Sequence, residues 1–245
     1  MKSGERTWEH DLKPRIQAMG VLRALRSMRF LDPSPEAMRR PSVPGQTTLG
    51  GRGENLSSVL QQICADPRRK GTLINWVREL TPLDVKDFSF GVDRSGKVLL
   101  GLVDSNRVET SAYSASDGTL RFLCLLAALL GDDSGMVYFL EDPETGLHPT
   151  RLHLLVGLIE SRVEAGAIQV IATTHSPQLL GYLSDESLND VLVAYRKDRQ
   201  SSQHLRRLYD FPNAEQLVRE QDVSELHSTG WFEDMIAFED EEPWK

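Results

Sequence analysis

Two adjacent carboxylates, Glu141 and Asp142, end an apolar run in the stretch FLEDPETGLHPTRL. The run itself, GMVYFL, has the length and composition of a strand buried in a parallel sheet. Ligands of open α/β sheets bind at the carboxyl ends of such strands. Acidic residues at this place commonly hold Mg²⁺ through water, because a hard cation prefers oxygen ligands and keeps much of its hydration shell. The sequence therefore predicts a magnesium site beside the two carboxylates.

A second apolar run, AIQVIA, ends in the stretch TTHSP. It places Thr173, Thr174 and His175 at the end of another predicted strand. Ligand sites of α/β sheets form where the carboxyl ends of parallel strands meet. We therefore expect the two strand ends to offer acids and a histidine to one crevice.

Upstream, the stretch SASDGTLRFLCLLAALL places small polar residues and Gly118 immediately before an apolar helix. The first turn of a helix has unpaired N–H groups and carries the positive end of the helix dipole. Such an arrangement binds anions, and a phosphate group suits it well.

These candidate sites need strands and helices that alternate along the chain. Residues 114–200 alternate polar, glycine-containing loops with apolar helices and apolar strands. This order indicates a parallel sheet with helices on its faces. We therefore predict an α/β fold with a mostly parallel sheet. Residues 201–245 are predicted to add a strand and a helix that ends in an acidic tail.

The first half of the chain has a different texture. Residues 1–83 combine helix-like stretches with a connector rich in Pro, Gly and Ser, DPSPEAMRRPSVPGQTTLGGRGEN, which we predict to be a linker. Residues 84–113 alternate apolar and polar positions around a turn at Asp93–Gly96, which is typical of an antiparallel β-meander. The helices predicted in the first region are Pro14–Arg29, Asn55–Ala65 and Thr72–Leu80.

Composition and charge exclude several classes of protein. The chain has 245 residues, of which 40% are hydrophobic and 26% charged, as in ordinary globular proteins. The net charge of −8 argues against a surface that coats nucleic acid. The longest apolar run, Phe122–Leu130, is too short to span a bilayer, so we expect no membrane partner. Because the N-terminus lacks a secretory signal and only Cys64 and Cys124 are present, we expect a cytoplasmic protein.

Four stretches, SDGT, VYFLEDPE, TGLHP and TTHSP, occur in the order and approximate spacing of the ABC-type ATPases. Together they resemble the predicted bacterial ATPases of the AAA family that are RecF- or SMC-like, a group that includes OLD-type nucleases and phage-defence ATPases. The resemblance covers Ser114–Tyr182 and makes residues 114–200 the C-terminal lobe of such an ATPase. It implies a P-loop NTPase-like fold, with ATP and Mg²⁺ as cofactors.

The resemblance also implies a role for each motif residue. Glu141 matches the Walker B carboxylate near Mg²⁺, and Asp142 matches the carboxylate that polarises the attacking water. His175 matches the switch histidine that senses the γ-phosphate. The signature motif, which contacts ATP bound to the opposite subunit, matches Ser116, Asp117, Gly118 and Thr119. The D-loop, which crosses the dimer interface, matches Thr145, Gly146, Leu147 and His148.

Two departures from the family pattern matter. The usual order of the acids is Asp then Glu, whereas here Glu141 precedes Asp142. The shorter carboxylate therefore stands where the base is expected, and we expect hydrolysis to be slow or to need a partner. No G-x-x-x-x-G-K-[ST] phosphate loop, the Walker A motif, occurs in the sequence, and the glycines of Gly45–Gly53 lack its Lys-Ser/Thr pair. We interpret the chain as the C-terminal part of such an ATPase or as a shortened relative.

Two classes of function stay open. In the first, the complete protein is a Mg²⁺-dependent ATPase that dimerises around nucleotide, as a homodimer or with a complementing chain that supplies the phosphate loop. It then switches an effector protein or DNA, in DNA repair or phage defence. In the second, the chain is a non-catalytic half-site or interaction module without a phosphate loop of its own. A nuclease is a weaker third hypothesis, because the residues after His175 lack the strand-and-glycine context of a Toprim domain.

Each motif taken alone also has a structural explanation. EDPE fits a solvated turn, SDGT fits a helix N-cap, and His175 fits a capping or core histidine. A metal pair of His148 and His153 is disfavoured because no acid or cysteine completes it. The basic stretches DPRRKG and YRKDRQSSQHLRRLYD are more typical of solvated faces than of contacts with nucleic acid phosphates. The shared order and spacing of the motifs favours the ATPase interpretation.

Overall fold

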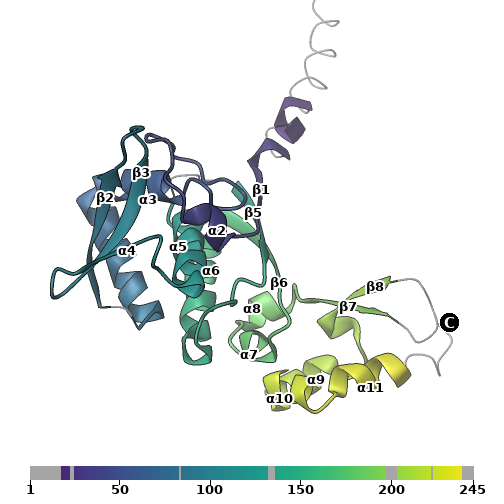
Figure 1. Ribbon diagram of the computed structural model, residues 1–245. Coiled ribbons are helices and arrows are strands. Elements are labelled where there is room, and N and C mark those ends of the chain that lie inside the picture. Colours follow the sequence, from purple (N-terminus) through teal and green to yellow (C-terminus); the bar gives the residue numbers. More distant parts are fainter. Residues whose placement is uncertain are drawn as a thin grey trace, which may run out of the picture. The chain divides into compact units, whose positions relative to one another are not determined.

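The computed structural model describes residues 18–22, 25–82, 84–131, 136–196, 203–221 and 223–238 (Figure 1). The chain divides into two compact units. Unit 1 contains Met1–Gly146 and Ser161–Thr173, and unit 2 contains Leu147–Glu160 and Thr174–Lys245.

The centre of unit 1 is a three-stranded parallel sheet. Its strands are β1 (Met28–Leu31), β5 (Met136–Glu141) and β6 (Ile168–Thr173), in the order β1-β5-β6. All pairings are parallel, and Leu140 lies opposite both Leu31 and Ala172. Both apolar runs singled out in the sequence, GMVYFL and AIQVIA, therefore form neighbouring parallel strands. The predicted α/β fold with a parallel sheet and flanking helices is confirmed.

Helix α5 (Asp117–Leu129) carries most of the apolar core of unit 1. The Ser116 side chain caps its N-terminus, where Oγ accepts a hydrogen bond from the Thr119 N–H at 3.1 Å. The helix is apolar on nearly all sides, which is typical of a helix enclosed by other elements. It packs against α2 (Pro35–Met38), α3 (Leu56–Ala65) and α4 (Pro67–Leu80). The residues of α5 that are completely shielded from solvent are Leu120, Leu123, Cys124, Leu126 and Leu129.

The Pro/Gly/Ser-rich connector is an integral part of unit 1, so its interpretation as a linker was wrong. The Asp32 N–H donates to the Gly51 carbonyl at 2.9 Å. Asn55 joins both sides of the segment, because its Oδ1 accepts from the Gly50 N–H at 2.8 Å and its Nδ2 donates to the Thr48 carbonyl at 2.9 Å. Backbone groups that find partners in this way give an irregular segment a fixed course.

The helical part of the first region differs from the prediction at two places. Met28 and Arg29, predicted to end a helix, belong to β1, because pairing with β5 overrides the local helical pattern. Residues 14–17, 23 and 24 of that predicted helix lie outside the described residues. Helix α3 agrees with the prediction, but α4 begins at Pro67, before the predicted Thr72. The cause is Asp66, whose carboxylate caps α4 by accepting from the Arg68 N–H at 2.8 Å.

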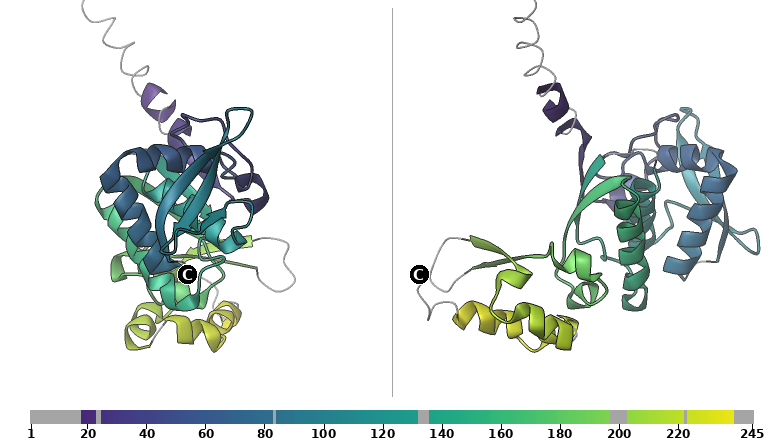
Figure 2. Two further views of the ribbon diagram at one scale, coloured as in Figure 1. Left: turned by 60° about the vertical axis from the view of Figure 1, so that its left-hand side comes forward. Right: turned by 180° about the vertical axis from the view of Figure 1, so that it is seen from behind.

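The predicted β-meander is confirmed. Strands β2 (Val85–Val92), β3 (Val98–Asp104) and β4 (Glu109–Ser111) form an antiparallel sheet, and α3 and α4 lie against it (Figure 2). In the turn, Asp93 Oδ1 accepts hydrogen bonds from Ser95 Oγ at 2.7 Å and from the Ser95 N–H at 2.8 Å. These bonds, led by the Ser95 hydroxyl, hold the pKa of Asp93 below its usual range. Gly96 supplies the positive φ of +79° that closes the turn.

Unit 2 has its own small core. Strands β7 (Leu192–Arg196) and β8 (Gln203–Arg207) pair antiparallel. Helix α6 (Leu152–Glu164) starts in this unit after the short turn Pro149–Arg151. The further helices are α7 (Pro177–Leu180), α8 (Asp185–Leu188), α9 (Ala214–Glu220), α10 (Val223–Ser228) and α11 (Trp231–Phe238). The buried core residues are Leu188, Leu208, Phe211, Ala214, Val223 and Met235.

The predicted C-terminal strand and helix correspond to β8 and α11, whereas the acidic tail lies outside the described residues. Among the residues that the structure describes, no helix has both the length and the apolar character needed to cross a bilayer.

Candidate functional site

The two adjacent acids lie at the carboxyl end of β5, as predicted. Glu141 is the last strand residue, is exposed to solvent, and lies opposite Thr173 at the end of β6. Asp142 leaves the strand with φ of +41°, in the left-handed region that non-glycine residues rarely adopt. Its N–H donates to the Thr173 carbonyl at 3.2 Å, and its carbonyl accepts from the Thr145 N–H at 2.9 Å. Conformations of this kind cluster at functional sites, where surrounding contacts hold them.

One oxygen of the Asp142 carboxylate, Oδ1, lies in an unusual environment. This oxygen is shielded from solvent and accepts no hydrogen bond from any residue that the structure describes. A buried acceptor without a partner costs free energy, and a charged one costs more than a neutral one. A cation or an ordered water at this oxygen would remove that cost. The arrangement therefore fits a water or metal site beside Asp142.

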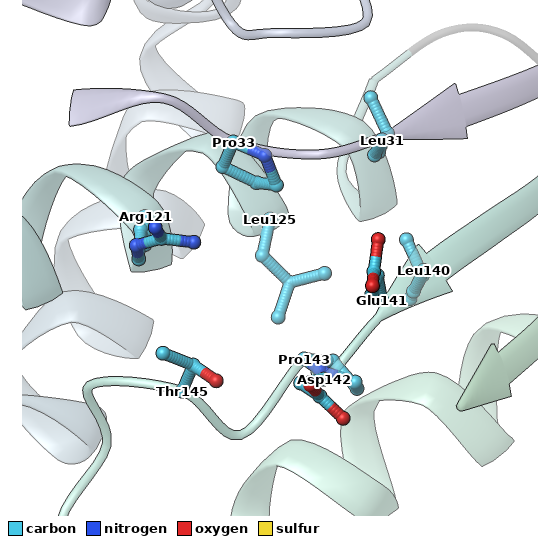
Figure 3. A pocket seen from close by; sticks show the side chains of 9 residues that line it. All are labelled: Leu31, Pro33, Arg121, Leu125, Leu140, Glu141, Asp142, Pro143 and Thr145. Atoms are coloured by element: carbon cyan, nitrogen blue, oxygen red, sulfur yellow. The ribbon is translucent and has the colours of Figure 1, made fainter. Parts of the chain in front are cut away.

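A pocket opens at this strand end and shows how the acids are surrounded (Figure 3). Its lining comes from the ends of β1 and β5, the loop after β5, and helix α5. Nine residues line it: Leu31, Pro33, Arg121, Leu125, Leu140, Glu141, Asp142, Pro143 and Thr145. The pocket therefore combines two carboxylates and one guanidinium group with several apolar walls.

The signature-like stretch lies against the loop that follows β5. A Cβ atom on Gly118 would come within 2.7 Å of the Gly146 carbonyl oxygen, and Gly146 itself has φ of +89°. Only two glycines allow the backbones to approach so closely. The structure thus brings together two motifs that are far apart in the sequence, through a contact that their spacing did not reveal.

Arg39 was not singled out in the sequence, yet it holds the start of α5. Its guanidinium donates to Asp117 Oδ1 at 2.6 Å and to the Ala115 carbonyl at 2.8 Å. Asp117 is thereby engaged in an ion pair, while Ser116 and Thr119 form the helix cap. An Arg two residues before a proline in an irregular segment carries no sequence signal for such a role.

The remaining predicted site residues belong to unit 2. His148 caps the turn Pro149–Arg151, and its Nδ1 lies 2.8 Å from Thr150 Oγ1. His175 is exposed and follows β6 by two residues. Leu147 is half-buried. Unit 1 therefore holds Ser116, Asp117, Gly118, Thr119, Glu141, Asp142, Thr145 and Gly146 of the predicted set.

The other candidate groups show no sign of a reactive or metal site. The His153 ring packs against Tyr182 at 5.8 Å between centroids. Within the described part of the chain, no three His, Cys, Asp or Glu side chains are placed to hold a metal ion. Burial raises the pKa of the Cys124 thiol to about 12 and that of Cys64 to about 11, so both thiols stay protonated at neutral pH.

The parallel sheet, the acids at the carboxyl end of β5 and the capped helix α5 define an α/β protein with a polar pocket at a strand end. Residues 23–181 match the family described as "AAA domain, putative AbiEii toxin, Type IV TA system". The chain belongs to this AAA family. No curated protein matches the sequence.

Two solved structures resemble the chain in part. One is the Smc head domain with a coiled coil and joint from Pyrococcus yayanosii, at 12% identity and a TM-score of 0.44; the match covers 66% of this chain and 29% of that chain. The other comes from work on ATP-driven dimerization and DNA-stimulated activation of SMC ATPases. It matches at 12% identity and a TM-score of 0.43, and the match covers 67% of this chain and 96% of that chain. The chain thus spans 29% of the length of the first structure.

Proposed function

We propose that this chain is the part of a cytoplasmic AAA-family ATPase that carries the metal-binding acids and the signature helix. The observation that carries the proposal is the buried, unpartnered Oδ1 of Asp142 next to Glu141 at one strand end. Magnesium takes one or two protein carboxylates and keeps several waters, which matches this donor set. Membership of the AAA family supports ATP as the ligand.

The residues of the site then have distinct tasks. Glu141 would hold Mg²⁺ through water, and the ion would supply positive charge for the phosphates. Asp142 orients the attacking water. The N–H groups at the start of α5, together with Ser116 and Gly118, bind the γ-phosphate of a nucleotide on a second subunit.

The resemblance assigns roles to two further stretches. His175 senses the γ-phosphate, and the stretch Thr145–His148 crosses the dimer interface. Transitions between bound and free states would switch an effector protein or DNA, with phage defence and DNA repair as the candidate processes.

The sheet of unit 1 supports a partner that supplies the missing phosphate loop. Parallel sheets are normally covered on both faces. Here Phe30 is 68% exposed and Ile171 is 55% exposed. Both lie in register with Phe139, whose ring stacks on Phe30 at 4.3 Å. A strand, loop and helix from a complementing segment or a second copy would cover this apolar face.

The second candidate function is a non-catalytic half-site that presents its signature helix to another ATPase. The absence of a phosphate loop from the sequence favours it. The two candidates differ in one requirement: catalysis needs Asp142 to orient water, whereas a half-site needs only the start of α5.

The test is ATP turnover by this chain combined with the polypeptide that carries the phosphate loop. The coding DNA upstream of the Met1 codon identifies whether that loop belongs to the same polypeptide. We expect Asp142→Ala to lower turnover by about a hundredfold or more while ATP binding persists, because general-base catalysis contributes factors of this size. Exposed Asp190 on the surface of unit 2 provides the control, and Asp190→Ala should leave turnover unchanged.

Unchanged turnover in Asp142→Ala would contradict the assignment of the base. If a bulky residue at Gly118 then abolished assembly with the partner while the variant kept the melting temperature of the wild type, the half-site would be the better description. If neither variant had an effect, both candidates would be wrong.

A further inference from the structure

Arg121 is the cation of the strand-end pocket and has no role so far. It stands on α5 one turn after Gly118, and its side chain points into the pocket (Figure 3). Glu141, the last residue of β5, and Asp142 and Thr145, from the following loop, also line this pocket (Figure 3). The cation and the acids therefore come from different elements and meet only in the folded chain.

The charges in this pocket do not neutralise one another. No hydrogen bond or ion pair joins the Arg121 guanidinium to any other residue within the described ranges. Asp142 Oδ1 is likewise without a hydrogen-bond partner there. A half-buried guanidinium group presents five N–H donors in a fixed, planar arrangement. The guanidinium group of Arg121 and the carboxylates are therefore each available to a ligand.

The walls of the pocket strengthen such an attraction. Leu31, Leu125 and Leu140 line it, and Leu125 stands one turn beyond Arg121 on α5. Charges act more strongly on one another where apolar groups displace water. A ligand that suits both sides must offer positive charge to the acids and negative charge to the guanidinium. A divalent cation bound to a phosphate group has this polarity.

We propose that Arg121 binds a phosphate group of the metal–triphosphate complex whose cation is held at Glu141. This inference rests on the proposed function, because it takes the ligand of that same site and adds the residue that contacts its anion. Guanidinium groups match phosphate oxygens in pairs, which gives the contact direction as well as charge. Helix α5 then serves two phosphate contacts, one through its N-terminus and one through Arg121.

The experiment uses the chain as it stands and measures binding of Mn²⁺, a spectroscopic substitute for Mg²⁺, by electron paramagnetic resonance. Mn²⁺ affinity is measured alone and with inorganic triphosphate. For the wild type we expect triphosphate to tighten Mn²⁺ binding. Arg121→Gln should keep the affinity for Mn²⁺ alone and lose about tenfold of the triphosphate effect, as for one charge-assisted hydrogen bond. Arg121→Lys should retain part of the effect, because it keeps the charge but not the paired geometry.

The matched control is Arg68→Gln, which removes an exposed cation from α4 and leaves the pocket intact. It should bind like the wild type. Melting temperatures of all variants show whether each is folded, and Arg121→Lys serves if Arg121→Gln does not fold.

Three outcomes overturn the inference: an undiminished triphosphate effect in Arg121→Gln, an equal loss in Arg68→Gln, or no triphosphate effect in the wild type. Failure of the proposed function looks different. In that case Glu141→Gln would bind Mn²⁺ as tightly as the wild type, whatever the behaviour of Arg121.

Discussion

Asp142 has several unusual structural features. It has a left-handed backbone, lies directly after strand β5, and keeps one carboxylate oxygen away from both solvent and hydrogen-bond donors. The Thr173 carbonyl and the Thr145 N–H hold its backbone in place. Stability lost at a single residue in this way is typical of a site prepared for a ligand.

We predict that Asp142→Asn stabilises the free chain. Asparagine tolerates the left-handed region better than most residues and removes the uncompensated charge. We expect the free energy of unfolding to rise by about 1 kcal/mol, as is common when a strained functional residue is replaced. Urea denaturation measures the change, and Asp190→Asn on the exposed surface should leave stability unaltered. A loss of stability in Asp142→Asn would show that the carboxylate is already satisfied in the free chain.

The elements that matter most are α5 and the loop after β5. Their backbones meet at Gly118 and Gly146, and Arg121 and Thr145 extend the contact into the pocket. Because the two backbones are in contact at this point, a displacement of one segment must displace the other. The signature-like stretch and the acids therefore form one structural unit rather than two separate motifs.

For this contact we predict that Gly118→Ala destabilises the chain by about 1–3 kcal/mol, because the new methyl group would lie 2.7 Å from the Gly146 carbonyl oxygen. Gly157→Ala is the control, since Gly157 is a helical glycine with open space around its Cβ position. That change should stabilise the chain by up to about 1 kcal/mol through helix propensity. Chemical denaturation measures the free energy of unfolding of both variants. Equal effects of the two substitutions would show that the close approach is easily relieved.

The whole molecule presents an incompletely covered parallel sheet. Phe30 and Ile171, on one face of the β1-β5-β6 sheet, leave large apolar side chains in water. Exposed apolar surface of this kind marks an interaction site or an aggregation risk. The molecule is therefore expected to gain stability from a partner that covers the face.

We predict that the isolated chain self-associates with increasing concentration and that Ile171→Lys weakens this association about tenfold. A lysine ammonium group cannot be buried against Phe30 and Phe139 without a large desolvation cost. Val92→Lys is the control, because Val92 is 67% exposed on the antiparallel sheet instead. Sedimentation equilibrium measures the self-association constants of the wild type and of both lysine variants. If both lysine variants associate like the wild type, this face is not the contact surface.

Features that depend on residues close together along the chain could be predicted from the sequence. Alternating polarity and the Asp93–Gly96 turn predicted the meander, and the two apolar runs predicted the strands that carry Glu141 and Thr173. Ser116, a residue that favours helix N-caps, indicated where α5 begins. Such signals are readable because a helix cap, a tight turn and a strand of period two are each set by residues close together along the chain.

Contacts between residues far apart along the chain became visible in the fold. The strand character of Met28 and Arg29 depends on β5, and the fixed course of the connector depends on Asn55. The pairing of Gly118 with Gly146, and the place of Arg121 beside the acids, arise from contacts between separate elements. Local pattern cannot reveal them, because side-chain burial and strand pairing are non-local interactions that override intrinsic propensity.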